Sequence, residues 1–498
     1  MRRIPWVHVP RACRRMSIAA LCLGLLACTA DAAPPPPDGT GSAPPASSPA
    51  HRPPSTHDWT RFGWDVAASG AATDSMGVTA ANVGTLKRQQ IAIDGTVDAS
   101  AIYLHGVEIQ GATHDAFFVT TTYGKTIAVD APTGAILWEY TPPGTARLEG
   151  TAQITTATPV ADPGREFLYA ASPDGFIQKL AVADGSPAWR TAITRLPTRE
   201  KIASALNFFR GRVIAVTGGY IGDAPPYQGH VAVLDGATGS LLQVWNSLCS
   251  GRSGLLAPAS CPQSDSAIWG RAGAVIDAAT GDIYVATGNG PWDGASNWGD
   301  AVVELDPDAT RILGNYTPVD TEQLDSEDLD LGSTSPVLLG GNLVAQGGKD
   351  AILRVLDWSR MAGTAPHRGG EASHVATPSG DRLFTAPAVY RPGGATWLLA
   401  ADNGDTSAWT LEGQRLALRW RASHGGTSPV VVDGLAFVYD PRGGLRVYDA
   451  TTGAPVTTLR CGRGHWNSPI VVDGMIALPE GNANHHRTAG VLDVWRLP

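Results

Sequence analysis

A repeated turn-and-strand motif constrains the fold of this chain more than any other feature of its sequence. In each copy an acidic residue ends an apolar run, and in the clearest copy, over 128–138, a Thr-Gly pair and then a Trp follow. Eight acidic residues mark the copies: Asp130, Asp184, Asp235, Asp306, Asp357, Glu412, Asp449 and Asp493. They recur about every 52 residues, which is the spacing of a four-stranded propeller blade with its loops.

A second repeat alternates with the first and marks where strands begin. Short apolar runs follow the pairs Thr158-Pro159, Ser335-Pro336, Ala386-Pro387, Ser428-Pro429 and Ser468-Pro469. Two of these runs end at Asp-Gly, the usual hairpin signal. Together the repeats predict an all-β fold, an eight-bladed β-propeller of four-stranded antiparallel blades over residues 58–498. Residues 59–65 precede the first blade and are the candidate strand that closes the ring against the last one.

Composition agrees with a turn-dense β protein. The 498 residues include 58 Gly and 37 Pro, which form turns and stop helices. Coiled coils and helical bundles are therefore excluded. The Asp and Thr side chains of the repeat are expected to hydrogen-bond within their own turns, and the Trp to pack between neighbouring blades.

The first 27 residues have the pattern of a signal peptide. Five Arg and no acid precede an apolar stretch over 16–27, which is too short to span a membrane. The stretch ends in Leu25-Leu26-Ala27-Cys28, which resembles a bacterial lipobox. We therefore expect residues 1–27 to be a lipoprotein signal peptide and Cys28 to carry the lipid. A plain secretory signal with an incidental Cys is the alternative.

Residues 28–57 form a Pro-rich tether that favours extended geometry and cannot build a core. Thr29 follows the lipidated Cys, which favours the outer membrane with the protein facing the periplasm. Only the lipid is then expected to contact the membrane. Removal of residues 1–27 changes the net charge from −9 to −14, which makes nucleic acid an unsuitable partner.

The repeat as a whole resembles that of the quinoprotein alcohol dehydrogenase-like propellers. This group includes the dehydrogenases that depend on pyrroloquinoline quinone (PQQ), among them the polyvinyl-alcohol dehydrogenases. It also includes, more distantly, the cofactor-free assembly lipoprotein BamB. The resemblance covers roughly residues 59–498 and does not by itself choose between catalysis and binding.

Residues 268–349 are similar to the active-site stretch of the PQQ dehydrogenases. The resemblance implies that Trp269 is the floor on which the quinone stacks and that Lys349 lies against the quinone carbonyls. It also implies that Asn289 and Asp330 bind Ca²⁺, and that Asp330 is the catalytic base, with Asp328 as second candidate. These roles suit the residue types, because aromatic faces stack on planar cofactors and carboxylates accept protons.

Two departures from that family pattern affect the expected site. Tyr220 stands where the family has an acidic Ca²⁺ ligand, so another acid such as Asp223 would have to replace it. The chain also has no Cys-x-x-Cys-His haem motif, so any electrons would go to a separate acceptor.

The cysteines fit an oxidising compartment. Cys249 and Cys261 are twelve residues apart in a loop between blades, and we expect a disulfide between them. Two further loops, over 465–469 and 481–486, are candidates for the mouth of the propeller's central channel. We assign them no further role.

Two functions are compatible with these features. The first is a lipid-anchored, periplasm-facing dehydrogenase that uses PQQ and Ca²⁺ to oxidise an alcohol or a sugar. The second is a non-catalytic, BamB-like propeller that binds protein or other cell-envelope partners.

Overall fold

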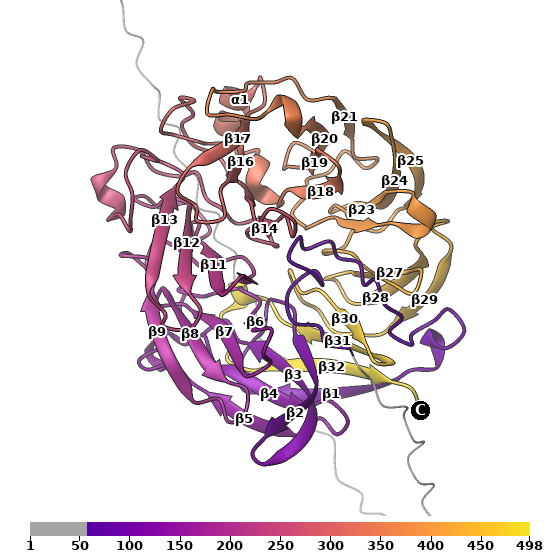
Figure 1. Ribbon diagram of the computed structural model, residues 1–498. Helices are drawn as coiled ribbons and strands as arrows, with labels where there is room; N and C mark the ends of the chain where they lie inside the picture. The colour runs from indigo at the N-terminus through magenta and orange to yellow at the C-terminus, as the bar shows by residue number, and fades with distance from the viewer. Residues whose placement is uncertain (1–56) are drawn as a thin grey trace, which may run out of the picture. The chain divides into compact units, whose positions relative to one another are not determined.

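The strands of this protein form eight antiparallel sheets of four strands each, arranged as the blades of a ring (Figure 1). The structure, a computed structural model, describes residues 57–498. The predicted eight-bladed propeller is confirmed. The predicted signal peptide, Cys28 and all of the tether except residue 57 lie outside the described residues.

Seven blades take their strands in chain order. They are β2 (Ile102–Ile109), β3 (Ala112–Thr120), β4 (Thr126–Asp130) and β5 (Ile136–Tyr140); β6 (Val160–Ala161), β7 (Phe167–Ser172), β8 (Phe176–Ala181) and β9 (Pro187–Ala192); β10 (Asn207–Phe209), β11 (Arg212–Val216), β12 (His230–Asp235) and β13 (Leu241–Asn246); β14 (Val275–Ile276), β15 (Ile283–Ala286), β16 (Val302–Leu305) and β17 (Ile312–Tyr316); β18 (Val337–Gly340), β19 (Leu343–Gln346), β20 (Ile352–Asp357) and β21 (Ser373–Ala376); β22 (Ala388–Tyr390), β23 (Trp397–Ala401), β24 (Thr406–Glu412) and β25 (Arg415–Ala422); β26 (Val430–Val432), β27 (Leu435–Tyr439), β28 (Leu445–Asp449) and β29 (Pro455–Leu459).

The eighth blade joins the two ends of the described chain. Its strands are β30 (Ile470–Val472), β31 (Met475–Glu480), β32 (Gly490–Arg496) and β1 (Lys87–Ile93). Short helices lie in the connections: η1 (Val83–Thr85), η2 (Ala146–Leu148), η3 (Pro258–Ser260), α1 (Thr321–Glu327), η4 (Leu331–Ser333), η5 (Trp358–Arg360), η6 (Pro392–Gly394) and η7 (Ala483–His485). No helix within residues 57–498 is long and apolar enough to cross a membrane.

The two sequence repeats correspond to fixed positions in the blades. The Pro pairs lie directly before the first strands β6, β18, β22, β26 and β30, and several marker acids end the third strands, as in β4, β12 and β28. In β4 the Asp130 carboxylate accepts the Thr133 backbone N–H at 2.9 Å, so the acid and the Thr stabilise their own turn as expected.

The Trp of one blade packs on the turn glycine of the next blade. The Trp420 indole N–H donates to the Ala450 carbonyl at 3.0 Å, and a Cβ on Gly453 would lie 2.6 Å from the Trp420 ring. Trp138 and Gly185 repeat this arrangement, and both glycines have a positive φ, near +72°. The glycine in this turn is therefore required by its backbone conformation and by its contact with the ring.

The expectation that residues 59–65 close the ring is wrong. β1 closes it, pairing with β32 from Lys87 opposite Arg496 to Ile93 opposite Gly490. Residues 59–65 form only an isolated bridge, between Trp59 and Tyr103 of β2. The physical reason is that this segment turns repeatedly, with Gly63 at φ +66°, and so cannot stay extended.

Residues 59–71 instead run along the first strands of several blades. Backbone amides on β6, β14, β22 and β26 donate to carbonyls of this segment at 2.7 to 3.0 Å. The buried Arg61 guanidinium donates to Asn207 Oδ1 at 2.7 Å and to the Phe208 carbonyl at 2.9 Å, both on β10. The segment therefore ties together the inner strands of the ring.

Candidate functional site

Two kinds of loop supply the residues of the candidate site. Trp269 and Asp330 precede the first strands β14 and β18, whereas Asn289 and Lys349 follow the second strands β15 and β19. Because the second strand runs antiparallel to the first, both kinds of loop lie at the same end of a blade. These four residues and Asp328 line one cavity of about 620 Å³. The structure thus brings together all five residues that the sequence predicts for the cavity.

Trp269 provides an aromatic face within this cavity. Its ring centroid lies 6.1 Å from that of Phe384 and 5.9 Å from that of Trp466, and the Lys349 Nζ lies over the Trp269 ring at 5.4 Å from its centroid. A Cβ on the adjacent Gly270 would lie 2.5 Å from the backbone at 334, so close packing fixes the Trp269 backbone. An aromatic face under an ammonium suits a planar ligand with electron-rich oxygens.

The Lys349 ammonium joins the two candidate carboxylates. Its Nζ lies 2.6 Å from Asp328 Oδ1 and also contacts Asp330. Burial raises the pKa of Asp330 even though the Lys349 charge opposes the shift. Burial also acts on Asp328, whose side chain is 61% exposed, but the Lys349 hydrogen bond outweighs it and lowers the pKa. Asp330 is therefore the buried carboxylate of the pair and the one whose proton affinity is raised.

Two neighbouring groups hold Asp330 in place. Its Oδ1 accepts the Asn289 backbone N–H at 2.8 Å. The next residue, Leu331, donates its N–H to Asp300 Oδ1 at 2.9 Å, and Asp300 is buried behind the loop. The pKa of Asp300 is raised well above its usual value by burial. These contacts aim Asp330 into the cavity.

The side chains do not form a complete Ca²⁺ site. The Asn289 side-chain atom nearest Asp330 lies 2.5 Å from Oδ1 and 3.0 Å from Oδ2, and an amide nitrogen at that position donates to both oxygens. The Tyr220 hydroxyl donates to the Pro197 carbonyl at 2.9 Å. Among residues 57–498 no three His, Cys, Asp or Glu side chains are grouped to hold a metal. Ca²⁺ takes 6 to 8 oxygens, so these side chains would not complete its coordination by themselves.

A set of acids forms one wall of the cavity. Asp223, the expected substitute ligand, lines the cavity together with Asp265 and Asp325. The Tyr227 hydroxyl donates to Asp223 Oδ1 at 3.0 Å. Burial raises the pKa of both Asp223 and Asp265. The Tyr227 side chain already donates to one acid of this wall. The carboxylates of the wall favour ligand groups that donate hydrogen bonds.

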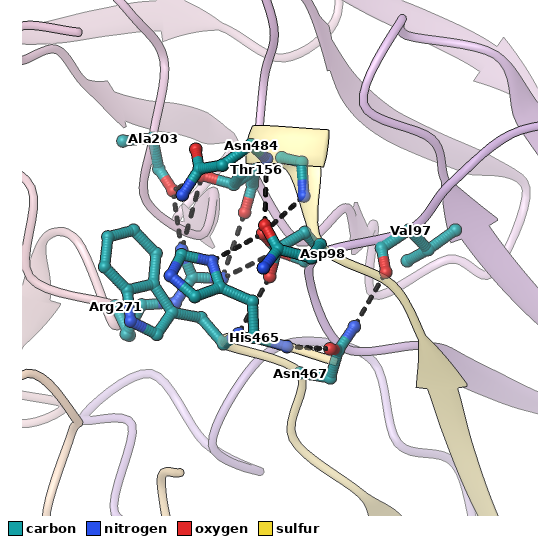
Figure 2. Close-up of polar contacts among 11 residues, drawn as sticks. Val97, Asp98, Thr156, Ala203, Arg271, His465, Asn467 and Asn484 are labelled. Atoms are coloured by element: carbon teal, nitrogen blue, oxygen red, sulfur yellow. Dashed lines mark hydrogen bonds and ion pairs between the residues drawn. The ribbon is translucent and has the colours of Figure 1, made fainter. Parts of the chain in front are cut away.

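Lys201 and His465 lie on a basic wall of the cavity. His465 contacts the buried carboxylate of Asp98, as Figure 2 shows. Asp98 is 1% exposed and accepts His465 Nδ1 at 2.8 Å and the backbone N–H groups of Trp466 and Ala483 at 2.9 Å each. The buried Arg271 guanidinium donates to the carbonyls of Asp98, Thr156 and Ala203 at 3.0 to 3.2 Å. Burial acts to raise the pKa of Asp98, but His465 and Arg271 outweigh it and lower the pKa to about 2.

The loop before Trp269 contains a disulfide between Cys249 and Cys261, whose Cα atoms lie 6.2 Å apart. Ser250 in this loop accepts the Trp298 indole N–H at 3.0 Å. Residues 249–261 are not among those that line the cavity.

Sequence reasoning missed several residues of the cavity. It assigned no role to His465, Trp466 or Asn484, although it placed their loops at the channel mouth, and it did not identify Phe384 or Lys201. Lysine is rare in this chain, with five copies, and that rarity was the signal that could have pointed to Lys201.

Comparisons with known proteins agree with the fold. A family profile described as outer membrane protein assembly factor BamB matches residues 71–254. The polyvinylalcohol dehydrogenase of Sphingopyxis sp. (strain 113P3) is 22% identical over 449 residues, which is 76% of this chain and 67% of that protein. The chain is therefore similar in sequence both to the BamB family profile, over part of its length, and to a dehydrogenase.

Two solved structures show the same fold at low sequence identity. Quinohemoprotein alcohol dehydrogenase from Comamonas testosteroni is 16% identical, with a TM-score of 0.64 over 88% of this chain and 80% of that chain. A europium-containing methanol dehydrogenase is 14% identical, with a TM-score of 0.66 over 88% of this chain and 98% of that chain.

Proposed function

We propose that this protein is a lipid-anchored dehydrogenase that binds a planar quinone such as PQQ over Trp269 and oxidises an alcohol or a sugar. The observation that carries the proposal is the joint position of Trp269, Lys349 and Asp330 in one cavity. The cavity volume, about 620 Å³, is within the range of small-molecule sites. A relative named polyvinylalcohol dehydrogenase supports the reaction class.

The side chains present divide the chemistry between them. A bound quinone would supply the acceptor for the hydride that leaves the substrate carbon. Trp269 supports the plane of that ligand, and the Lys349 ammonium stabilises negative charge on its oxygens. Asp330 takes the proton of the substrate hydroxyl, for which its raised proton affinity suits it. The substrate leaves as a carbonyl compound, and a separate acceptor removes the electrons.

No step of this proposal depends on Ca²⁺, because the described donors do not complete its coordination. Lys349 supplies the positive charge beside Asp330.

The proposed location is the bacterial cell envelope, with the lipid on Cys28 in the outer membrane and the propeller in the periplasm. The sequence over 1–57 supports this placement. A Cys28→Ala variant should move from the membrane fraction to the soluble periplasmic fraction. Retention of that variant in the membrane would contradict the lipid anchor.

Reduction of a dye by the purified, PQQ-loaded protein with a panel of alcohols and sugars tests the catalytic role. Asp330→Asn should lower the rate by roughly 10² to 10⁴-fold, as expected for loss of a general base. Asp328→Asn, the matched neighbour, should retain most of the rate.

An equal loss in both variants would contradict the assignment of the base to Asp330. If the protein takes up no PQQ at micromolar concentrations, the dehydrogenase proposal fails. The alternative would then be a cofactor-free propeller that binds envelope partners, which Tyr220 in place of an acidic ligand favours.

A further inference from the structure

Lys201 is a buried lysine that lines the same cavity. It is 7% exposed, and its backbone forms a bridge with Gly218. Within residues 57–498 its ammonium makes no hydrogen bond or ion pair, whereas the Lys349 ammonium contacts two carboxylates. The three N–H donors of Lys201 therefore have no acceptor among residues 57–498 and are available to a ligand in the cavity.

The surroundings of Lys201 favour an anionic ligand beside it. Burial lowers the pKa of Lys201 to about 8, Asp98 opposes the shift, and Arg271 adds to it. A buried charge without a partner is costly, so sequences rarely keep one that nothing uses. At pH 7 an ammonium with this pKa is still mostly protonated.

Asp98 does not serve as the partner of Lys201. Its oxygens already accept three hydrogen bonds, from His465, Trp466 and Ala483 (Figure 2). The Arg271 guanidinium lies beside the same carboxylate. Asp98 is therefore the single acid beside two cations, Lys201 and Arg271, and this wall carries an excess of positive charge.

Three of the acids that line the cavity have partners other than Lys201. Asp328 and Asp330 contact Lys349, and Asp223 is bonded to Tyr227. The cavity thus offers an acidic wall that accepts hydrogen bonds and a basic wall that suits an anion.

We propose that Lys201 binds a carboxylate of the ligand that occupies this cavity. The identity of that ligand rests on the proposed function, but the anion subsite itself does not. The carboxylate has two possible sources: PQQ, which is a tricarboxylate, or a substrate that carries a carboxylate beside its hydroxyl. Both sources share the chemistry that Lys201 recognises.

Equilibrium titration of the full-length protein, followed by tryptophan fluorescence, tests the subsite. The probes are PQQ, the PQQ trimethyl ester and citrate, and the variants are Lys201→Met and Lys201→Gln. Lys87→Gln, at an exposed position on β1, is the matched control. If the quinone supplies the carboxylate, Lys201→Met should bind PQQ roughly 10-fold or more weakly, as expected for a charged hydrogen bond, and should bind the ester as wild type does.

If the substrate supplies the carboxylate instead, the titrations should give a different result. PQQ would then bind equally to wild type and Lys201→Met, whereas the KM for 6-hydroxyhexanoate would rise in the variant and the KM for 1,6-hexanediol would not. If wild type binds citrate but not PQQ, and Lys201→Met loses citrate, the subsite stands and the dehydrogenase proposal fails.

Two results would overturn the inference. The first is a Lys201→Met variant that binds PQQ and citrate as wild type does and shows no change in KM for either alcohol. The second is a Lys201→Met variant whose Tm falls and whose binding of the ester weakens together with that of PQQ, which would indicate a structural role. We expect Tm to stay the same or rise, because the substitution removes a buried charge without a partner.

Discussion

Burial shifts the pKa of single residues in the interior of this propeller toward their neutral forms. Glu200 and Lys201 are neighbours in the chain, and both are buried. Burial raises the pKa of Glu200 to about 7 and lowers that of Lys201 to about 8. Glu200 accepts hydrogen bonds from the Thr194 hydroxyl and, at 3.3 Å, from the Gln228 N–H, which offset only part of the effect.

Glu200 should make the stability of the protein depend on pH. Its folded-state pKa of about 7 lies above the ordinary value of 4.5, so the folded protein binds the extra proton. Stability is therefore unaffected below pH 4.5, falls as the pH rises to 7, and is lower above pH 7 by about 3 kcal/mol. Glu200→Gln should remove this loss, which urea unfolding at pH 5 and pH 8 would measure.

The exposed Glu149 provides the control for that experiment. Glu149→Gln should leave the pH dependence as in wild type. If Glu200→Gln also leaves it unchanged, Glu200 is not the buried acid described here.

The sequence predicted some site residues because they follow ordered motifs. Trp269, Asn289, Asp330 and Lys349 stand in the expected order and do meet in one cavity. Lys201 belongs to no motif, and its importance comes from burial and from the absence of an acceptor among residues 57–498. Neither property can be seen in a single sequence.

At the level of elements, local turn chemistry was predictable and the closing strand was not. Pro pairs and Asp-Gly turns fix where first strands begin and end, since these residues act on their own backbone. β1 carries no such marker and is polar over its first four residues. Its place in the sheet depends on β32, about 400 residues away in the chain.

The contact between a turn glycine and a Trp of the preceding blade can be tested with a matched pair. Gly453 and Gly413 both have positive φ, +72° and +61°, but a Cβ meets the Trp420 ring only at Gly453. Gly413→Ala should cost about 1 kcal/mol of unfolding free energy. Gly453→Ala should cost a further 1 to 3 kcal/mol, roughly, because the ring must move.

Thermal and urea unfolding of the two glycine variants would measure that difference. Equal costs in both would show that the ring yields freely and that the glycine is needed only for its φ.

For the whole molecule, ring closure places loops from separate blades around one cavity with two unlike walls. Asp223, Asp265 and Asp325 form the acidic wall, whereas Lys201 and His465 lie on the basic one. Repeat spacing predicted the ring, but the charge of each wall depends on which loops meet across it. The chain's overall negative charge gave no sign of a basic wall.

Above all, we propose that this cavity binds a planar quinone on Trp269 without needing Ca²⁺. Titration of the full-length protein with PQQ in excess EDTA, measured by calorimetry, tests it most directly. We expect saturable binding of one quinone per chain at micromolar concentrations, weakened roughly 10-fold or more by Trp269→Ala. Absence of saturable binding in EDTA, or equal binding by Trp269→Ala, would contradict the claim.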